Sequence, residues 1–163
     1  MCNTTLAHGF STVCSTERPE CHAPSGYRSS DFSAANGARD RQRDMILAFW
    51  ESQGVAQWRN GGAGGGGRWY VRDMVNDGAE LLPLARRGDA RDANVAEFSH
   101  VISAANGGAW CACNLLPEAA NTNVARGDAD IQALSMSARA LLAAWRGYWT
   151  SNVARKASLA RIA

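Results

Sequence analysis

A tract of eight residues, Asn60 to Gly67 (NGGAGGGG), divides the sequence and restricts where helices and strands can form. Glycine loses more conformational freedom on folding than any other residue, so we expect no regular element to run through this tract. It is not a phosphate-binding P-loop, because Arg68 and Trp69 follow it in place of the Lys-Ser/Thr pair that such a loop requires. We interpret the tract as a flexible linker.

Two segments, one on each side of this linker, have the apolar period of an amphipathic helix. The first covers residues 40–54 and ends at Gly54, which is a natural stop. The second predicts a long C-terminal helix over about 129–150, whose apolar stripe is expected to pack into the core. That stripe consists of Ile131, Leu134, Ala138, Leu141, Leu142, Ala144, Trp145 and Trp149.

Length and composition indicate one small domain. The chain has 163 residues, of which 46% are hydrophobic, enough for a modest core. Residues 1–40 show no apolar period and are expected to be a flexible N-terminal arm or an uncertain translation start, so the domain covers 41–163. The start lacks the features of a signal peptide, and no apolar run is long enough to cross a membrane. We therefore expect a soluble, cytoplasmic protein.

The five cysteines do not indicate a disulfide framework, because their number is odd and their spacing irregular. Cys14 with Cys21-His22, and Cys111 with Cys113, lack the paired knuckles of a structural zinc site. Free thiols in a reducing compartment are the expectation.

The net charge of +2 does not by itself indicate a nucleic-acid-binding protein. Positive charge is nevertheless concentrated after residue 129, where Arg139 and Arg146 lie, and Asp130 is the only acidic residue there. A phosphate backbone responds to such local charge, so Arg139 and Arg146 are candidate nucleic-acid contacts. A solvated basic face on a terminal helix remains the alternative.

The region around His100 combines strand, turn and helix signals. Residues 95–103 read as a strand that carries His100, and Asn106-Gly107-Gly108 is a hairpin signal. A returning strand is expected to end near Asn114-Leu115, and a short helix to run from Pro117 to Gly127. Since this unit is only about 30 residues long, flanking helices must cover it. The expected fold class is α+β.

The segment SHVISAANGGAWCACNLLPEAANTNVARGD, Ser99 to Asp128, resembles the HNH family of nucleases. The similarity rests on a histidine after a strand, a Gly-Gly turn, an Asn-Leu pair, and a later Asn followed by Arg-Gly-Asp. His100, Asn114 and Asn123 follow one another at spacings of 14 and 9 positions, as in the family's usual range. The third position is Asn rather than His, which makes the pattern an HNN variant. The first 95 residues add nothing to the match except a possible supporting helix.

The resemblance implies a ββα-metal (His-Me finger) core over about 95–128 and a metal-dependent endonuclease that cuts or nicks DNA. His100 would be the general base, because neutral imidazole can take a proton from water near neutral pH. Asn114 would hold the turn and keep the His100 ring oriented, and Asn123 would offer an oxygen to the metal. Arg126 would contact a phosphate that flanks the cut. The family's small stand-alone members suggest a phage or mobile-element origin.

One departure from the family concerns the metal. Many members carry Asp or His as a ligand immediately before the base, whereas this chain has Ser99. A hydroxyl is a weak ligand, so we expect Ser99 and Asn123, with water and DNA phosphate, to hold Mg²⁺ or Mn²⁺, with Zn²⁺ possible. Glu97 is a further candidate, although a solvated carboxylate is the ordinary interpretation.

Several alternatives stay open at this point. The chain would be a catalytically inactive DNA-binding or assembly protein if Ser99 marks a lost metal site. It would be a helical interaction protein if the terminal helix docks a partner. Asn121 competes with Asn123 for the ligand position, and Arg126 is also an ordinary cation at a helix C-terminus. DNA or RNA, the strand preference and the oligomeric state are not indicated.

Overall fold

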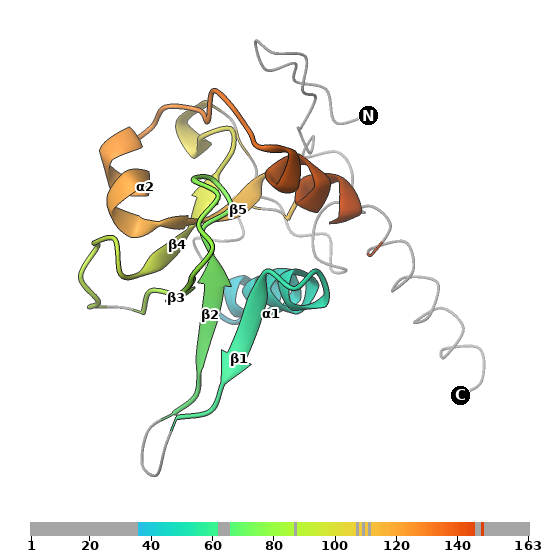
Figure 1. Ribbon diagram of the computed structural model, residues 1–163, viewed down its shortest axis with the longest axis vertical. Helices are drawn as coiled ribbons and strands as arrows, with labels where there is room; N and C mark the ends of the chain where they lie inside the picture. Colours follow the sequence, from blue (N-terminus) through green and yellow to red (C-terminus); the bar gives the residue numbers. More distant parts are fainter. Residues whose placement is uncertain are drawn as a thin grey trace, which may run out of the picture.

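The computed structural model describes residues 36–61, 66–86, 88–106, 108, 110, 112–145 and 148, and these form an α+β fold (Figure 1). A three-stranded antiparallel sheet has the order β1-β2-β3, with β1 at Ala56–Arg59, β2 at Arg68–Arg72 and β3 at Leu81–Pro83. A second antiparallel pair is formed by β4, Ala96–His100, and β5, Leu115–Ala119. The expectation of α+β is therefore confirmed.

The first helix, α1, covers Asn36–Ser52 and supplies the largest buried side chains. It begins four residues before the expected Asp40, within the segment that we expected to be an arm. Residues 1–35 lie outside the described residues. Phe49 packs edge-on against Trp145 at 5.0 Å between ring centroids, and Trp50 stacks on Phe98 at 4.9 Å. The helix thus joins the C-terminal segment to β4.

The C-terminal helix starts later than expected, at residue 136 instead of 129, and is described as far as 145 and at 148. Its start has a local cause, because the Ser135 hydroxyl accepts a hydrogen bond from the Ala138 N–H at 3.1 Å, as an N-cap residue does. Ile131 and Leu134 are buried as expected, but from the extended segment before the helix. Trp149 and Arg146 lie outside the described residues.

The segment from β4 to the second described helix differs in detail from the expectation. The strand of β4 ends at His100 instead of Ser103, and the connection is a 101–114 loop with a short 3-10 helix, η3, Ala104–Asn106. Pro117 does not begin a helix: it lies in β5, where it pairs with Phe98 and its carbonyl accepts the Met74 N–H. A returning antiparallel strand is present as expected, but β5 begins at Leu115, where that strand was expected to end, so its predicted position was wrong.

Helix α2, Ala120–Arg126, follows β5 without a connecting loop. It ends at Gly127 as predicted, because Gly127 has a φ of +58°, which glycine adopts without a Cβ clash. Its N–H closes the last turn onto the carbonyls of Asn123 and Val124. Two antiparallel strands and a helix thus follow each other in the order ββα (Figure 1).

The glycine-rich tract connects two strands that pair with each other, β1 and β2, and residues 62–65 of it lie outside the described residues. The tract therefore joins neighbours in one sheet instead of separating two parts of the chain. Figure 1 shows β1 and β2 extending away from the ββα unit. Glycines tolerate the backbone conformations of such a strand connection at low cost.

Two further expectations concern membranes and cysteines. No helix within the described residues has the length and apolarity needed to cross a bilayer. Cys113 is disulfide-bonded, which corrects the expectation of a free thiol at that position. The other four cysteines lie outside the described residues.

The buried carboxylate of Asp73 ties the loop after β2 to the end of β5. One oxygen accepts the N–H groups of Val75 and Asn76, and the other accepts the Asn76 amide at 2.8 Å and the Ala119 N–H at 3.1 Å. The first sheet and the ββα unit are thus connected by backbone groups that converge on a single side chain.

We expect Asp73→Ala to lower the free energy of unfolding by about 2–4 kcal/mol, because buried N–H groups would lose their acceptor. Urea unfolding followed by tryptophan fluorescence measures this change. The control is Asp92→Ala, since Asp92 is exposed and accepts one local N–H from Asn94. Equal stability of the two variants would contradict the role given to Asp73.

Candidate active site

A cavity of about 340 Å³ lies where β4 and α2 meet. His100, the last residue of β4, and Asn123, in the middle of α2, both line it. Two predicted site residues that are 23 positions apart are therefore brought to one cavity. The remaining lining residues are Arg91, Glu97, Phe98, Ser103, Ala104, Val124, Arg126, Gly127 and Asp128.

His100 is half-buried and its ring packs edge-on against Trp110, with centroids 5.4 Å apart. Trp110 in turn contacts Phe98, which stacks on Trp50 of α1. Aromatic pairs of this kind prefer edge-to-face and offset geometries, so they restrict the orientation of each ring. The orientation of His100 thus depends on a row of aromatic rings that reaches the core.

Asn114 is buried and holds the loop that follows His100. Its Oδ1 accepts the Ile102 N–H at 2.9 Å, and its Nδ2 donates to the Ile102 carbonyl at 3.0 Å. The Asn114 carbonyl also accepts the Val101 N–H at 2.9 Å. Asn114 was expected in the loop before the helix, and it lies one strand earlier, immediately before β5. Its hydrogen bonds fix the backbone directly after the histidine.

Ser99 and Asn123, the two expected metal ligands, are brought together by Arg126. Its Nη2 donates both to Ser99 Oγ and, at 3.0 Å, to Asn123 Oδ1. Ser99 is only 1% exposed. The amide of Asn123 donates to Glu97 Oε2 at 3.1 Å, so both ends of this side chain are engaged. Asn121, the competitor of Asn123, is exposed and does not line the cavity.

Arg126 points inward, whereas the sequence suggested a phosphate contact or a cation at the end of a helix. Its Nη2 lies 2.6 Å from Glu118 Oε2, and its Nη1 donates to the Ala129 carbonyl at 2.7 Å. Glu118 is 2% exposed, so this is a buried ion pair. Glu118 was missed by the sequence analysis, although a carboxylate within the apolar run LLPEAA was a signal of such a pair.

The register of the two strands places Glu97 directly opposite Glu118. Like charges at such positions destabilise a sheet unless they are compensated. Here Arg126 pairs with Glu118, and Arg91 pairs with Glu97 at 3.2 Å between Nε and Oε1. Asn123 links the two pairs by donating to Glu97 and accepting from Arg126. A connected polar network therefore joins the buried Glu118 to four residues that line the cavity, namely Arg91, Glu97, Asn123 and Arg126.

The residues expected to hold a divalent metal ion do not fit one in this arrangement. A Mg²⁺ ion demands oxygen ligands at about 2.0–2.1 Å in near-ideal octahedral geometry. An ion between Ser99 and Asn123 would stand where the Arg126 guanidinium stands. Within the described residues, no three His, Cys, Asp or Glu side chains gather as a metal-binding group.

The other predicted nucleic-acid contacts lie elsewhere. Arg139 is exposed on the C-terminal helix, where its Nε donates to the Leu134 carbonyl at 3.1 Å. It does not line the cavity of His100. Arg146 lies outside the described residues. These positions stay predictions.

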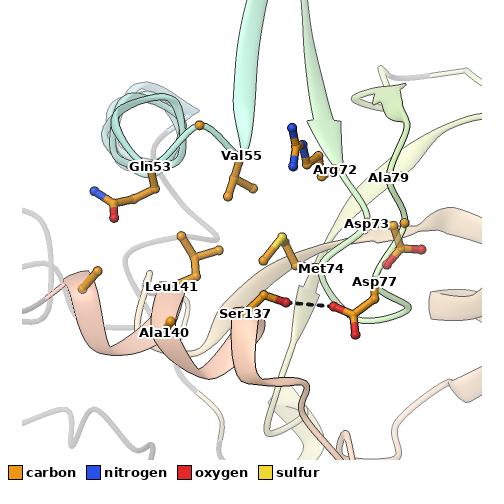
Figure 2. Close-up of a pocket in the computed structure, with 13 residues that line it drawn as sticks. Gln53, Val55, Arg72, Asp73, Met74, Asp77, Ala79, Ser137, Ala140 and Leu141 are labelled. Atoms are coloured by element: carbon orange, nitrogen blue, oxygen red, sulfur yellow. Dashed lines mark hydrogen bonds between the residues drawn. The ribbon is translucent and has the colours of Figure 1, made fainter.

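A larger cavity, of about 570 Å³, lies between the end of α1, the loop after β2 and the C-terminal helix (Figure 2). Val55, Met74 and Leu141 give it an apolar wall. Its acidic side chains have structural partners, because Asp73 accepts backbone N–H groups and Asp77 accepts the Ser137 hydroxyl at 2.8 Å. The smaller cavity therefore holds the stronger catalytic candidates.

Comparisons of the chain with protein-family models, with curated proteins and with solved structures each found no match.

Gly108 explains why the expected turn contains glycine. A Cβ at this position would lie 1.7 Å from the Ile102 carbonyl oxygen and 2.8 Å from Asn114 Nδ2. Both atoms belong to the hydrogen-bonded contact that closes the loop after His100. No side chain fits there without breaking that contact.

We expect Gly108→Ala to lower the free energy of unfolding by about 2–4 kcal/mol, because the backbone at Ile102 must move. Gly66→Ala is the control: nothing lies within 4 Å of its Cβ position, so the stability should stay equal or rise slightly. Thermal unfolding measured by circular dichroism separates the two variants. An unchanged midpoint for Gly108→Ala would refute the close approach.

Proposed function

We propose that the chain is an HNH-like endonuclease that hydrolyses phosphodiester bonds of DNA, with His100 as the general base. The observation that carries the proposal is the cavity shared by His100 and Asn123. Further support comes from the ββα order of β4, β5 and α2, and from the contact of Asn114 with the backbone after the histidine. These are the positions and roles that the resemblance assigns to such a unit.

The chemistry requires a base and positive charge near the scissile phosphate. A neutral imidazole accepts a proton from the attacking water, and charged groups stabilise the oxygens on which negative charge develops. Arg91 and Arg126 both line the cavity with His100. The Arg91 side chain is 68% exposed, although its Nε pairs with Glu97. Arg91 is our candidate for the flanking phosphate contact.

We expect the purified protein to nick supercoiled plasmid, and His100→Ala to slow nicking about 100-fold or more, since a general base contributes at least that factor. Gel electrophoresis of plasmid over time measures the rate. The control is Asn121→Ala, which changes an exposed residue of α2 and should leave the rate of nicking equal to that of the wild type. A His100→Ala protein that cuts as fast as the wild type would show the assignment to be wrong.

The β1–β2 hairpin provides a candidate surface for DNA. Its register pairs Arg59 with Arg68, which places these guanidinium groups on one face with Tyr70 and Arg72. The opposite face carries Val71 and Trp69, which pack on the core. Two arginines directly opposite each other cost stability unless their charges are compensated.

Partners within the chain distinguish the arginines of the hairpin. Arg68 pairs with Asp89, and a hydrogen bond from the Arg86 N–H, joined by the charge of Arg68, lowers the pKa of the Asp89 carboxyl. Arg59 is exposed, with its guanidinium 4.4 Å from the Tyr70 ring, and Arg72 is exposed as well. Arg59 and Arg72 are therefore the better candidates for phosphate contacts.

We expect Arg59→Ala with Arg72→Ala to weaken duplex binding and to reduce the slope of log K against log salt by about 2, because each phosphate contact adds about 0.9. Fluorescence anisotropy at several salt concentrations measures the slope, in a His100→Ala background that prevents cleavage. The matched control, Arg59→Lys with Arg72→Lys, keeps the charges and most of the slope. An unchanged slope in the alanine protein would exclude this surface.

A second candidate function is a non-catalytic DNA-binding or assembly protein built on the same ββα unit. The observation that favours it is the engagement of Ser99 and Asn123 by Arg126, which removes the expected metal ligands. This candidate predicts retention of DNA without nicking under any divalent ion. It also predicts that His100→Ala leaves DNA retention unchanged.

A further inference from the structure

Three oxygen atoms from three elements surround one nitrogen of Arg126, a residue that lines the cavity of His100. They are Ser99 Oγ of β4, Glu118 Oε2 of β5 and Asn123 Oδ1 of α2, and the nitrogen is Arg126 Nη2. A guanidinium nitrogen of this type carries two hydrogens, so three acceptors exceed its ordinary bonding capacity. At least one hydrogen is therefore shared between two acceptors.

The same oxygens are the donor types that a hard divalent ion prefers, namely a carboxylate, an amide oxygen and a hydroxyl. A guanidinium also binds carboxylate oxygens strongly, and it is always charged. The two cations therefore compete for one position. Arg126 is held in advance, because α2 carries its backbone and the Ala129 carbonyl accepts its Nη1 at 2.7 Å.

The charge balance also disfavours a second cation. Glu118 is compensated by Arg126, and Glu97 by Arg91. A divalent ion added to this network would be repelled by a guanidinium that is fixed within hydrogen-bond distance of the same oxygens. For the ion to enter, Arg126 would have to leave and expose the charge of Glu118 in a buried position.

We infer that the Arg126 guanidinium is the resident cation of this cavity and keeps a divalent metal ion from binding between Ser99 and Asn123. This inference concerns cation binding alone and does not rest on the proposed nuclease activity. It reverses the expectation that Ser99 and Asn123 hold Mg²⁺ or Mn²⁺. Removal of Arg126 should therefore create a metal site that the wild-type chain lacks.

The test uses Mn²⁺ alone as the probe and measures the electron paramagnetic resonance signal of the free ion. Arg126→Met should bind one more equivalent of Mn²⁺ than the wild type. Its affinity for Mn²⁺ at this position should be at least about tenfold higher than that of the wild-type protein. That factor is the lower end of what changes around a metal site produce. Arg139→Met removes an equal charge from an exposed helix position and should bind Mn²⁺ like the wild type.

Arg126→Met leaves the Glu118 carboxylate buried without its partner, which could unfold the protein. A second variant therefore removes this buried charge as well. In Arg126→Met with Glu118→Gln the buried charge is gone, while Ser99, Asn123 and Glu97 keep their oxygens. We expect this protein to fold, as judged by circular dichroism, and to gain Mn²⁺ binding, more weakly than the single variant.

Two results would overturn the inference. One is Mn²⁺ binding by the wild type that Asn123→Ala abolishes, because the ion would then share the site with Arg126. The other is a folded double variant that binds Mn²⁺ no better than the wild type. Since no readout involves DNA, a protein that never nicks plasmid would refute the proposed function and leave this result unaffected.

Discussion

The contact between Asn114 and Ile102 determines the geometry of the ββα unit. Its two side-chain hydrogen bonds close the loop of residues 101–114 that connects β4 to β5. The backbone hydrogen bond from the Val101 N–H to the Asn114 carbonyl continues the pairing of the two strands. The register that follows places His100 opposite Leu115 and Ser99 opposite Leu116. A shift of one residue would move Ser99 and Glu97 to the other face of the strand, away from Glu118.

The elements with a long apolar period were predictable from sequence, and the boundaries set by side chains were not. Burial of Phe49, Trp50 and Leu141 followed from periodicity alone. The start of the last helix depends on Ser135, whose hydroxyl accepts the Ala138 N–H. This capping interaction is known only from the structure. Pro117 suggested a helix start by its type, but the register of β5 places it in a strand.

The candidate site divides in the same way. The resemblance to HNH nucleases grouped His100 with Asn123, and both side chains line the same cavity. Arg126 and Glu118 are eight positions apart across a strand–helix junction, and their pairing depends on the direction of α2. No sequence period encodes that direction, so the ion pair between Arg126 and Glu118 was not predicted.

The ion pair between Glu118 and Arg126 affects both the stability of the fold and the charge in the cavity. A buried carboxylate without a partner is costly, so Glu118 requires a cation at its position. Arg126 meets this need from α2, and its Nη2 also reaches Ser99 of β4 and Asn123 of its own helix. The interaction that fixes the helix against both strands therefore also places a guanidinium in the cavity that His100 lines. Replacing Arg126 would therefore alter both the packing of α2 on the two strands and the charge within the cavity.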